Sequence, residues 1–230
     1  MDQMVVNSAT IGIVISLLAY EIGVLLKSKF KLAVFNPLLI SIVLVIGFLV
    51  LFRIDYESYN ASAHYLGYLL TPATVSLAIP LYLQLELLKK NVAAIVGGIT
   101  AGVIASMGTV LALAYLFGLS HEEYVTLLPK SITTAIGMGV SEELGGYVTI
   151  SVAVIIITGV LGNIIADFVC RIVRIKSPIS RGLAIGTAAH AIGTARAMEM
   201  GEVEGAMSSL AIVVAGLLTV IGASFFAPLL

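Results

Sequence analysis

The sequence predicts an all-α integral membrane protein that crosses the bilayer several times. Of its 230 residues, 60% are apolar and only 11% are charged, and the mean hydropathy is +1.12. Soluble domains are roughly 45–50% apolar and about 25% charged, so this chain lacks the charge to cover a surface facing water. A soluble enzyme, a disordered protein and a nucleic-acid-binding protein are therefore not expected. One cysteine, Cys170, excludes an internal disulfide framework.

The gaps between charged residues locate the membrane segments. A helix needs about 20 mostly apolar residues to cross a bilayer, and the 12 basic and 13 acidic residues leave several stretches of that length. We expect seven to eight segments, some of them discontinuous or re-entrant. They lie near 8–26, 34–52, 65–87, 92–119, 125–143, 147–170, 180–198 and 204–227.

Basic clusters set the expected orientation, because cytoplasmic loops of membrane proteins carry an excess of Lys and Arg. Such clusters follow the segments 8–26, 65–87 and 147–170. If those three loops are cytoplasmic, the segment 125–143 must enter and leave on one side of the membrane. The competing model makes 65–87 re-entrant instead, which leaves Lys89 and Lys90 outside.

An internal repeat appears when the chain is aligned with itself at an offset of 113 residues. Thr74 then falls on Thr187, and Glu86 falls on Glu199. The expected segments of the two halves, 34–119 and 147–227, run in opposite directions within a single domain of residues 1–230. Inverted repeats of this kind are typical of secondary transporters, whose substrate site lies where the halves meet.

Small residues at every fourth position predict close helix packing, because they allow backbones to approach in lipid. One such line lies in 92–119 and the other in 204–227. Their members are Gly98, Gly102 and Ser106, and Ala211, Ala215, Thr219, Ala223 and Ala227.

Three segments look unable to form one continuous helix. The segment 65–87 contains Pro72 and Pro80, each of which removes a helical N–H, and we expect two half-helices with an unwound stretch between them. The segment 180–198 is rich in glycine and threonine and contains two ionisable residues, His190 and Arg196. The segment 125–143 carries Lys130 directly after a proline.

Together these broken segments predict a binding site for a small anion. Free N–H groups at half-helix N-termini attract anions, and ionisable residues inside membrane segments are functional candidates by default. Arg196 or Lys130 would complement the charge, and His190 could carry a proton; alternatively, His190 is only hydrogen-bonded to a neighbouring helix and the two cations only reach the interface. The predicted substrate-binding residues are Thr71, Thr74, Ser76, Lys130, Ser131, Thr133, Thr134, Thr187, His190, Thr194 and Arg196.

Three stretches of the sequence resemble signature stretches of the LrgB family. They are LLTPATVSLAIPLY (69–82), LLPKSITTAIGM (127–138) and GLAIGTAAHAIGTARAMEMGEVEGAMSSLA (182–211). The resemblance extends from about residue 10 to the C-terminus. One departure is Ala135, where the family often has proline after the Thr-Thr pair.

The resemblance implies two descriptions, because the family includes CidB and the C-terminal portion of the plastid glycolate/glycerate translocator of plants. One is a transporter of small carboxylates such as glycolate, glycerate or pyruvate; the other is an antiholin-like regulator of murein hydrolases and cell lysis that works with a small LrgA-type membrane protein. The broken segments and the repeat favour the transporter. We expect a multi-pass protein of the cytoplasmic membrane that forms homo-oligomers, most simply dimers, with no cofactor, no metal and no enzymatic activity.

Overall fold

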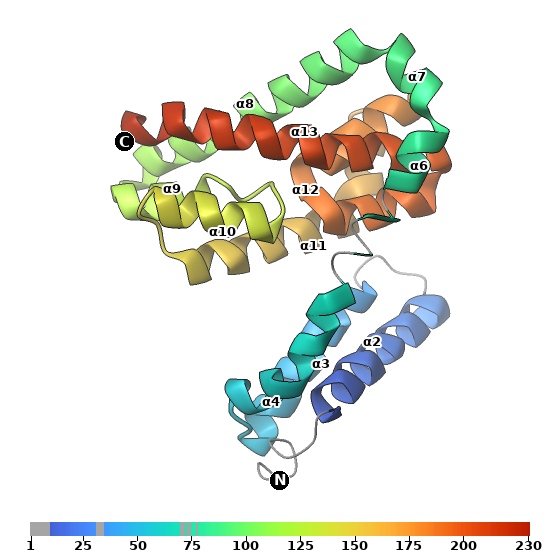
Figure 1. The fold of residues 1–230 in the computed structure, drawn as a ribbon, viewed down its shortest axis with the longest axis vertical. Helices are drawn as coiled ribbons and strands as arrows, with labels where there is room; N and C mark the ends of the chain where they lie inside the picture. Colours follow the sequence, from blue (N-terminus) through green and yellow to red (C-terminus); the bar gives the residue numbers. More distant parts are fainter. Residues whose placement is uncertain (1–9, 31–34, 70–71, 73–74, 77) are drawn as a thin grey trace. The chain divides into compact units, whose positions relative to one another are not determined.

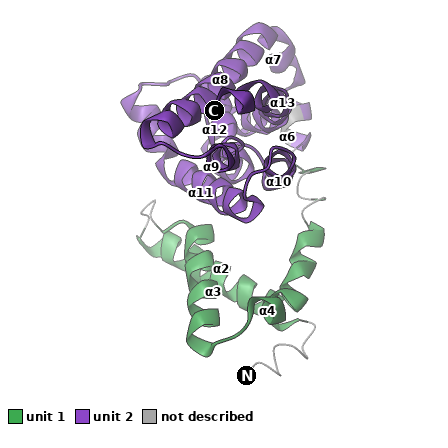
Figure 2. Ribbon diagram, turned by 90° about the vertical axis from the view of Figure 1, so that its left-hand side faces the viewer, with its two compact units in different colours: residues 1–76 green, residues 77–230 purple. Residues whose placement is uncertain are grey.

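The computed structural model describes residues 10–30, 35–69, 72, 75, 76 and 78–230, and no residue in these ranges forms a β-strand. The chain divides into two compact units, Met1–Ser76 and Leu77–Leu230, coloured separately in Figure 2. The predicted all-α fold is thereby confirmed for the described part of the chain.

The first unit is a small group of helices in which α2 packs against α3 and α4. The backbone N–H of Gly12 in α2 donates to Ser62 Oγ at 2.8 Å. Asn36 caps α3 by accepting from two backbone N–H groups, and Pro37 follows at the first helical position, where its missing N–H costs nothing. The helices are α2 (Ile11–Phe30), α3 (Pro37–Phe52), α4 (Tyr56–Ala63) and the 3₁₀ helix η1 (His64–Leu69).

The second unit contains the longest helices of the described chain (Figure 1). Local signals fix several of their ends: Ser120 and Glu123 form a capping box at the start of α9, and Gly118 ends α8 in the left-handed conformation with φ 64°. The elements are α6 (Ala78–Leu83), α7 (Leu85–Lys90), α8 (Val92–Phe117), α9 (His121–Leu127), α10 (Thr134–Glu143), α11 (Val148–Ile172), α12 (Pro178–Met200), α13 (Glu202–Phe226) and the 3₁₀ helix η2 (Ala227–Leu229).

The core of the second unit lies where α13 meets α8, α9 and α12. The small-residue line that the sequence predicts along 204–227 is buried, from Ala211 to Ala223 on α13 and at Ala227, where η2 begins. It packs in one cluster with larger apolar side chains of α8, and Tyr124 of α9 donates to the carbonyl of Phe226 at 2.9 Å. The predicted role of that line in packing is therefore confirmed. The buried side chains of α8 are Ile95, Ile99, Val103, Met107, Val110 and Ala114.

Four helices of the described chain are long and apolar enough to cross a membrane. They correspond to four predicted segments, 8–26, 92–119, 147–170 and 204–227. A fifth predicted segment, 34–52, is the shorter apolar helix α3 of 16 residues. A membrane protein is therefore supported by these candidate spans, which are Ile11–Phe30, Val92–Phe117, Val148–Ile172 and Glu202–Leu229.

The three remaining predicted segments are the ones expected to be discontinuous. In 125–143, α9 ends at Leu127 and α10 begins only at Thr134. In 180–198, two residues of α12 have non-helical backbone angles. In 65–87, η1 ends at Leu69 and α6 begins at Ala78, and most of the expected unwound stretch lies outside the described residues.

The boundary between the compact units falls at Ser76–Leu77, inside the predicted repeat half 34–119. The compact units and the predicted halves, 34–119 and 147–227, are therefore different divisions of the chain. The inverted repeat stays a prediction.

Candidate functional site

A cavity of about 760 Å³ lies in the second unit, among α8, α11, α12 and the turn between α9 and α10. Its volume falls in the range of roughly 300–1,000 Å³ that is usual for small-molecule sites. Small and apolar residues form most of its wall. The polar residues in the wall are Ser106, Thr109, Lys130, Ser131, Thr158, Ser180 and Thr187.

Lys130 is the one charged side chain among the described residues that line this cavity. It is half-buried, and its Nζ donates to Ser106 Oγ at 3.2 Å and to Ser131 Oγ at 3.0 Å. The two hydroxyl oxygens lie 3.1 Å apart. The turn that carries Lys130 is anchored by Leu128 and Pro129, both fully buried, so the ammonium group is directed towards α8.

Within the described chain, no carboxylate forms an ion pair with Lys130. A cation that is partly removed from water without a counter-charge is destabilising. The arrangement of one ammonium group and two hydroxyls therefore attracts an anion. The ammonium group can donate a hydrogen bond to it, and so can whichever hydroxyl does not donate within the Ser106–Ser131 pair.

Thr187 lies on the α12 side of the same cavity and is 7% exposed. Its Oγ1 is the one buried side-chain polar atom of the described residues that has no hydrogen-bond partner. Buried polar groups in proteins are nearly always paired. This hydroxyl oxygen is an exception, and because it has almost no accessible surface, it is covered by protein rather than open to the cavity.

The predicted break in the segment 180–198 is confirmed, and it lies at Ala189 and His190. His190 has φ 41° and ψ −140°, a conformation that is rare for a residue with a side chain. Its ring Nε2 donates to the carbonyl of Ile155 in α11 at 3.0 Å. Because the acceptor is a backbone carbonyl, this contact supports the alternative interpretation of His190 as a residue that fixes the helix break.

The location of the break depends on the close approach of α11. A Cβ atom added at Gly159 would lie only 2.7 Å from His190 Cε1, so no larger residue fits there without movement. The sequence suggested the glycines and threonines of α12 itself as the cause of the break. The structure instead places the non-helical residues opposite a glycine of the neighbouring helix.

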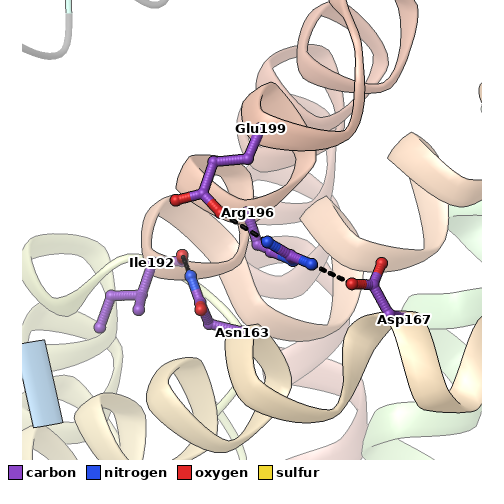
Figure 3. A network of polar contacts seen from close by, with 5 residues as sticks. All are labelled: Asn163, Asp167, Ile192, Arg196 and Glu199. Atoms are coloured by element: carbon purple, nitrogen blue, oxygen red, sulfur yellow. Dashed lines mark hydrogen bonds and ion pairs between the residues drawn. The ribbon is translucent and has the colours of Figure 1, made fainter. Parts of the chain in front are cut away.

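Arg196 lies in a separate polar network on the far side of the break (Figure 3). Its guanidinium pairs with Asp167 of α11, and it donates to Glu199 at 2.5 Å. Asn163 of α11 donates to the carbonyl of Ile192 at 2.7 Å. The two basic residues predicted to bind the anion therefore have different partners. Arg196 contacts two carboxylates, whereas Lys130 contacts two hydroxyls.

The structure brings together three of the predicted site residues, Lys130, Ser131 and Thr187, in one cavity wall. The described lining does not include Thr133, which is the N-cap residue of α10, or Thr134, which begins that helix. Thr71 and Thr74 lie outside the described residues.

Four further predicted residues lie elsewhere. His190 and Arg196 make the contacts given above and are absent from the described cavity wall. Thr194 is buried, donates to the carbonyl of His190 at 2.9 Å and lies 2.7 Å from the hydroxyl of Ser208. Ser76, in the first unit, is exposed and donates to the carbonyl of Pro72 at 2.8 Å.

Ser106 is a site residue that was not predicted from the sequence. The spacing of Gly98, Gly102 and Ser106 predicted helix packing, and all three residues line the cavity. The sequence feature that could have identified Ser106 is a hydroxyl in line with two glycines. Glycines leave space beside the helix, and the hydroxyl can form a hydrogen bond to a ligand in that space. Small residues serve packing and cavity walls alike, so the pattern alone did not separate the two roles.

The long apolar helices, together with a largely apolar cavity that has one polar cluster at Lys130, define a helical membrane protein with a small-molecule-sized site. The chain belongs to the LrgB-like family, whose model matches residues 16–229. It is similar to proteins called "Antiholin-like protein LrgB" in Bacillus mycoides (strain KBAB4) and Bacillus cereus (strain B4264). In each comparison 40% of residues are identical over 218 residues, which is 94% of this chain and 95% of the relative. No solved structure matches the chain.

Proposed function

We propose that this protein carries small monocarboxylates across the cytoplasmic membrane and that the cavity at Lys130 binds them. The observation that carries the proposal is an ammonium group, half-buried in a cavity wall, whose described partners are hydroxyls rather than carboxylates. A carboxylate would supply the missing counter-charge. Charge-assisted hydrogen bonds of this kind are about twice as strong as neutral ones.

The rest of the wall suits a short carbon chain. Glycine and alanine residues of α8 and α12 line the cavity beside the polar cluster, so a ligand of two or three carbons can place its apolar part against them. The resemblance suggests glycolate, glycerate or pyruvate. The broken helices next to the cavity add support, because discontinuous helices line substrate sites in many secondary transporters.

We also propose a membrane topology for this carrier. It has seven to eight segments, an inverted repeat, and a re-entrant segment at 125–143. A cysteine placed beside Lys89 should react with an impermeant thiol reagent only from the cytoplasmic side. Reaction from outside would instead favour the arrangement in which 65–87 is re-entrant.

A second candidate function is antiholin-like regulation of murein hydrolases and cell lysis. The name of the relatives, "Antiholin-like protein LrgB", favours this function more directly than it favours transport. In this case the chain would act in complex with an LrgA-type small membrane protein. Both functions are compatible with a homo-oligomer, for which a dimer is the simplest form.

Reconstitution into liposomes distinguishes the candidates. A carrier takes up labelled glycolate or pyruvate in a saturable manner, and unlabelled substrate competes. A pore leaks unrelated solutes of similar size without saturation. A regulatory subunit gives no flux alone but forms a stable complex with an LrgA-type protein. Absence of carboxylate uptake both with and without that partner would refute the carrier proposal.

Proton coupling through His190 is a separate part of the proposal. If His190 carries a proton, an imposed proton gradient should accelerate uptake by the wild-type protein but not by His190→Gln. Equal acceleration of both proteins would assign His190 to the helix break alone. Thermal unfolding of the two proteins provides the control for stability.

A further inference from the structure

The helix α12 reverses its direction at the break, and its first arm, residues 178–188, runs parallel to α13. A Cβ atom added at Gly182 would touch the backbone oxygen of Glu204, and one added at Gly186 would touch that of Ser208. A step of four residues along this arm therefore matches a step of four residues in the same direction along α13.

The second arm of α12, residues 191–200, runs antiparallel to α13. The hydroxyl of Thr194 lies 2.7 Å from that of Ser208, whereas a Cβ atom added at Gly205, nearer the start of α13, would lie 3.0 Å from Cγ of Met198. Later residues of this arm thus contact earlier residues of α13. The two arms form a hairpin, and the helix break is its turn.

Both ends of this hairpin lie beside the C-terminal end of α11. A small cavity of about 210 Å³ is lined there by Arg181 from the first arm, Met200 from the end of the second arm, and Arg171 of α11. Arg196 of the second arm pairs with Asp167 of α11. The helix α12 therefore begins and ends at the same end of the unit, and it is not one of the four candidate spans of the described chain.

The dimensions and the hydrogen bonds of the hairpin suit a segment that enters a membrane and returns. Each arm is about 15 Å long at the rise of an α-helix, which is half of a hydrocarbon core of roughly 30 Å. Irregular backbone at that depth must be buried in protein or line a cavity. The carbonyl of Ile192 accepts from Asn163 at 2.7 Å, and the ring of His190 donates to the carbonyl of Ile155, so α11 supplies partners to the turn.

The helices α9 and α10 form a second hairpin, which lies at the opposite end of the unit (Figure 1). The hydroxyl of Ser151, near the start of α11, lies 2.8 Å from the carbonyl oxygen of Thr126 in α9 and 2.7 Å from the hydroxyl of Ser141 in α10. Tyr124 of α9 donates to the carbonyl of Phe226, at the end of α13. The two hairpins thus enter the unit from opposite ends.

A sequence pattern marks the two hairpins as related units. An Ala-Ile pair, followed by a glutamate eight residues after the alanine, occurs in both return arms, at 135–143 and 191–199, and again at 78–86. The spacings between the three copies, 57 and 56 residues, together give the offset of 113 residues at which the chain aligns with itself. The three copies are followed by long helices, α8, α11 and α13. A return arm followed by a long helix is therefore the repeated unit.

We propose that α12 is a re-entrant hairpin with both ends on the membrane face that carries Arg171, Arg174 and Lys176, and that α9 and α10 form its counterpart on the other face. This arrangement replaces the crossing expected for 180–198. Because basic loops are cytoplasmic, α13 crosses outward and the C-terminus lies outside. The arrangement does not depend on which ligand the cavity binds.

The same arrangement sets the face from which the cavity at Lys130 is reached. The cavity wall extends along α8 to Ala94 and along the first arm of α12 to Ser180, both close to the cytoplasmic ends of these helices. At the opposite end, Leu128 and Ile132 of the α9–α10 hairpin are 1% and 2% exposed, so packed side chains close the cavity there. Lys130 is therefore reached from the cytoplasmic face in this structure.

Single cysteines test the arrangement in the full-length protein carrying Cys170→Ala, which removes the one native cysteine. Lys176→Cys and Glu122→Cys mark the two faces, and Glu202→Cys probes the end of the α12 hairpin. Sealed vesicles of either orientation are treated with a small membrane-impermeant methanethiosulfonate, and labelling is compared with that of the denatured protein. Glu202→Cys should be labelled from the same face as Lys176→Cys and remain unlabelled from the other face.

Leu230→Cys gives an independent measurement, because the whole of α13 separates it from Glu202. It should be labelled from the face that labels Glu122→Cys. Labelling of Glu202→Cys from the face of Glu122→Cys, or of Leu230→Cys from the face of Lys176→Cys, would show that α12 crosses the membrane and would overturn the inference. Either position decides the question if the other variant does not fold.

Lys130→Cys tests the access path in the same vesicles. It should react faster from the face that labels Lys176→Cys, and an equal or faster reaction from the other face would contradict the path. Labelling does not require transport, so a protein that carries no carboxylate still gives a result. Conversely, saturable glycolate uptake by a protein whose Glu202→Cys variant is labelled from outside would overturn the hairpin and leave the proposed function intact.

Discussion

Lys130 and Arg196 were both candidate partners for a bound anion, and the structure gives them different surroundings. Arg196 pairs with Asp167 and Glu199, so its charge is already compensated. Lys130 lies in a cavity wall, where its described partners are the hydroxyls of Ser106 and Ser131. The comparison teaches that a cation within apolar sequence indicates a ligand site only if folding leaves its charge without a carboxylate.

Loss of the charge at Lys130 should have the largest effect. Lys130→Gln can still donate to a neighbouring hydroxyl but cannot attract an anion. A hydrogen bond to a charged group contributes about 1.5–3 kcal/mol, so saturable glycolate uptake at low substrate concentration should fall at least tenfold. Lys89→Gln, the same substitution in α7, is the matched control and should leave uptake unchanged. A similar loss of glycolate uptake in both variants would contradict a specific role for the charge of Lys130.

Loss of one hydroxyl beside Lys130 should have a smaller effect. Ser131→Ala removes one of the two groups that accept from Nζ and leaves the other in place. A neutral hydrogen bond contributes about 1 kcal/mol, so the KM for glycolate should rise roughly fivefold while the maximal rate changes little. Ser180→Ala removes a hydroxyl from another part of the cavity wall and should change KM less than twofold. A larger effect at Ser180 would place the ligand elsewhere in the cavity.

Loss of the charge at Arg196 should have the smallest effect on uptake. Arg196→Gln removes the contacts with Asp167 and Glu199, whose side chains are 39% and 48% exposed. Ion pairs that face solvent contribute about 0–1 kcal/mol. The unfolding temperature should therefore fall by a few degrees at most, roughly 2–4 °C, with uptake retained within about twofold.

Asp167→Asn provides a second test of the Arg196 network. Its unfolding temperature should resemble that of Arg196→Gln. The free energy of unfolding of the double variant should lie within about 0.5 kcal/mol of that of either single variant, because both substitutions remove the same contact. If Arg196→Gln abolished uptake while the protein stayed folded, the contrast between the two cations would be reversed.

The sequence was sufficient to predict the long continuous helices. Four predicted segments match the candidate spans, because the gaps between charged residues are long enough to define them. Discontinuity was also predictable, since Pro129 and the glycines of 180–198 are poor helix formers. These signals are local, and each acts within one segment.

The exact position of the helix break was not predictable, because it depends on another helix. Ala189 and His190 are the non-helical residues, and nothing in either residue type alone requires a break. The carbonyl of Ile155 and the close approach of Gly159 come from α11. Contacts between distant parts of the sequence therefore decide where the weakened helix bends.

The sequence could not show which of Lys130 and Arg196 lacks a carboxylate partner, for the same reason. Asp167 precedes Arg196 by 29 residues, and only the packing of α11 against α12 brings them together. Ser106 likewise meets Lys130 across 24 residues. The sequence identified the candidates for the site, and their pairing required the fold.

Chemical restoration of the charge tests the central role of Lys130 most directly. In a Lys130→Cys variant that also carries Cys170→Ala, the new thiol is alkylated either with bromoethylamine, which restores an ammonium group, or with iodoacetamide, which adds a neutral group of similar size. Modification is verified by mass spectrometry before saturable glycolate uptake is measured in liposomes. We predict that the unmodified variant is inactive and that only the aminoethylated protein recovers uptake. Recovery with both reagents, or with neither after complete modification, would contradict the assignment of Lys130 as the charge that binds the carboxylate.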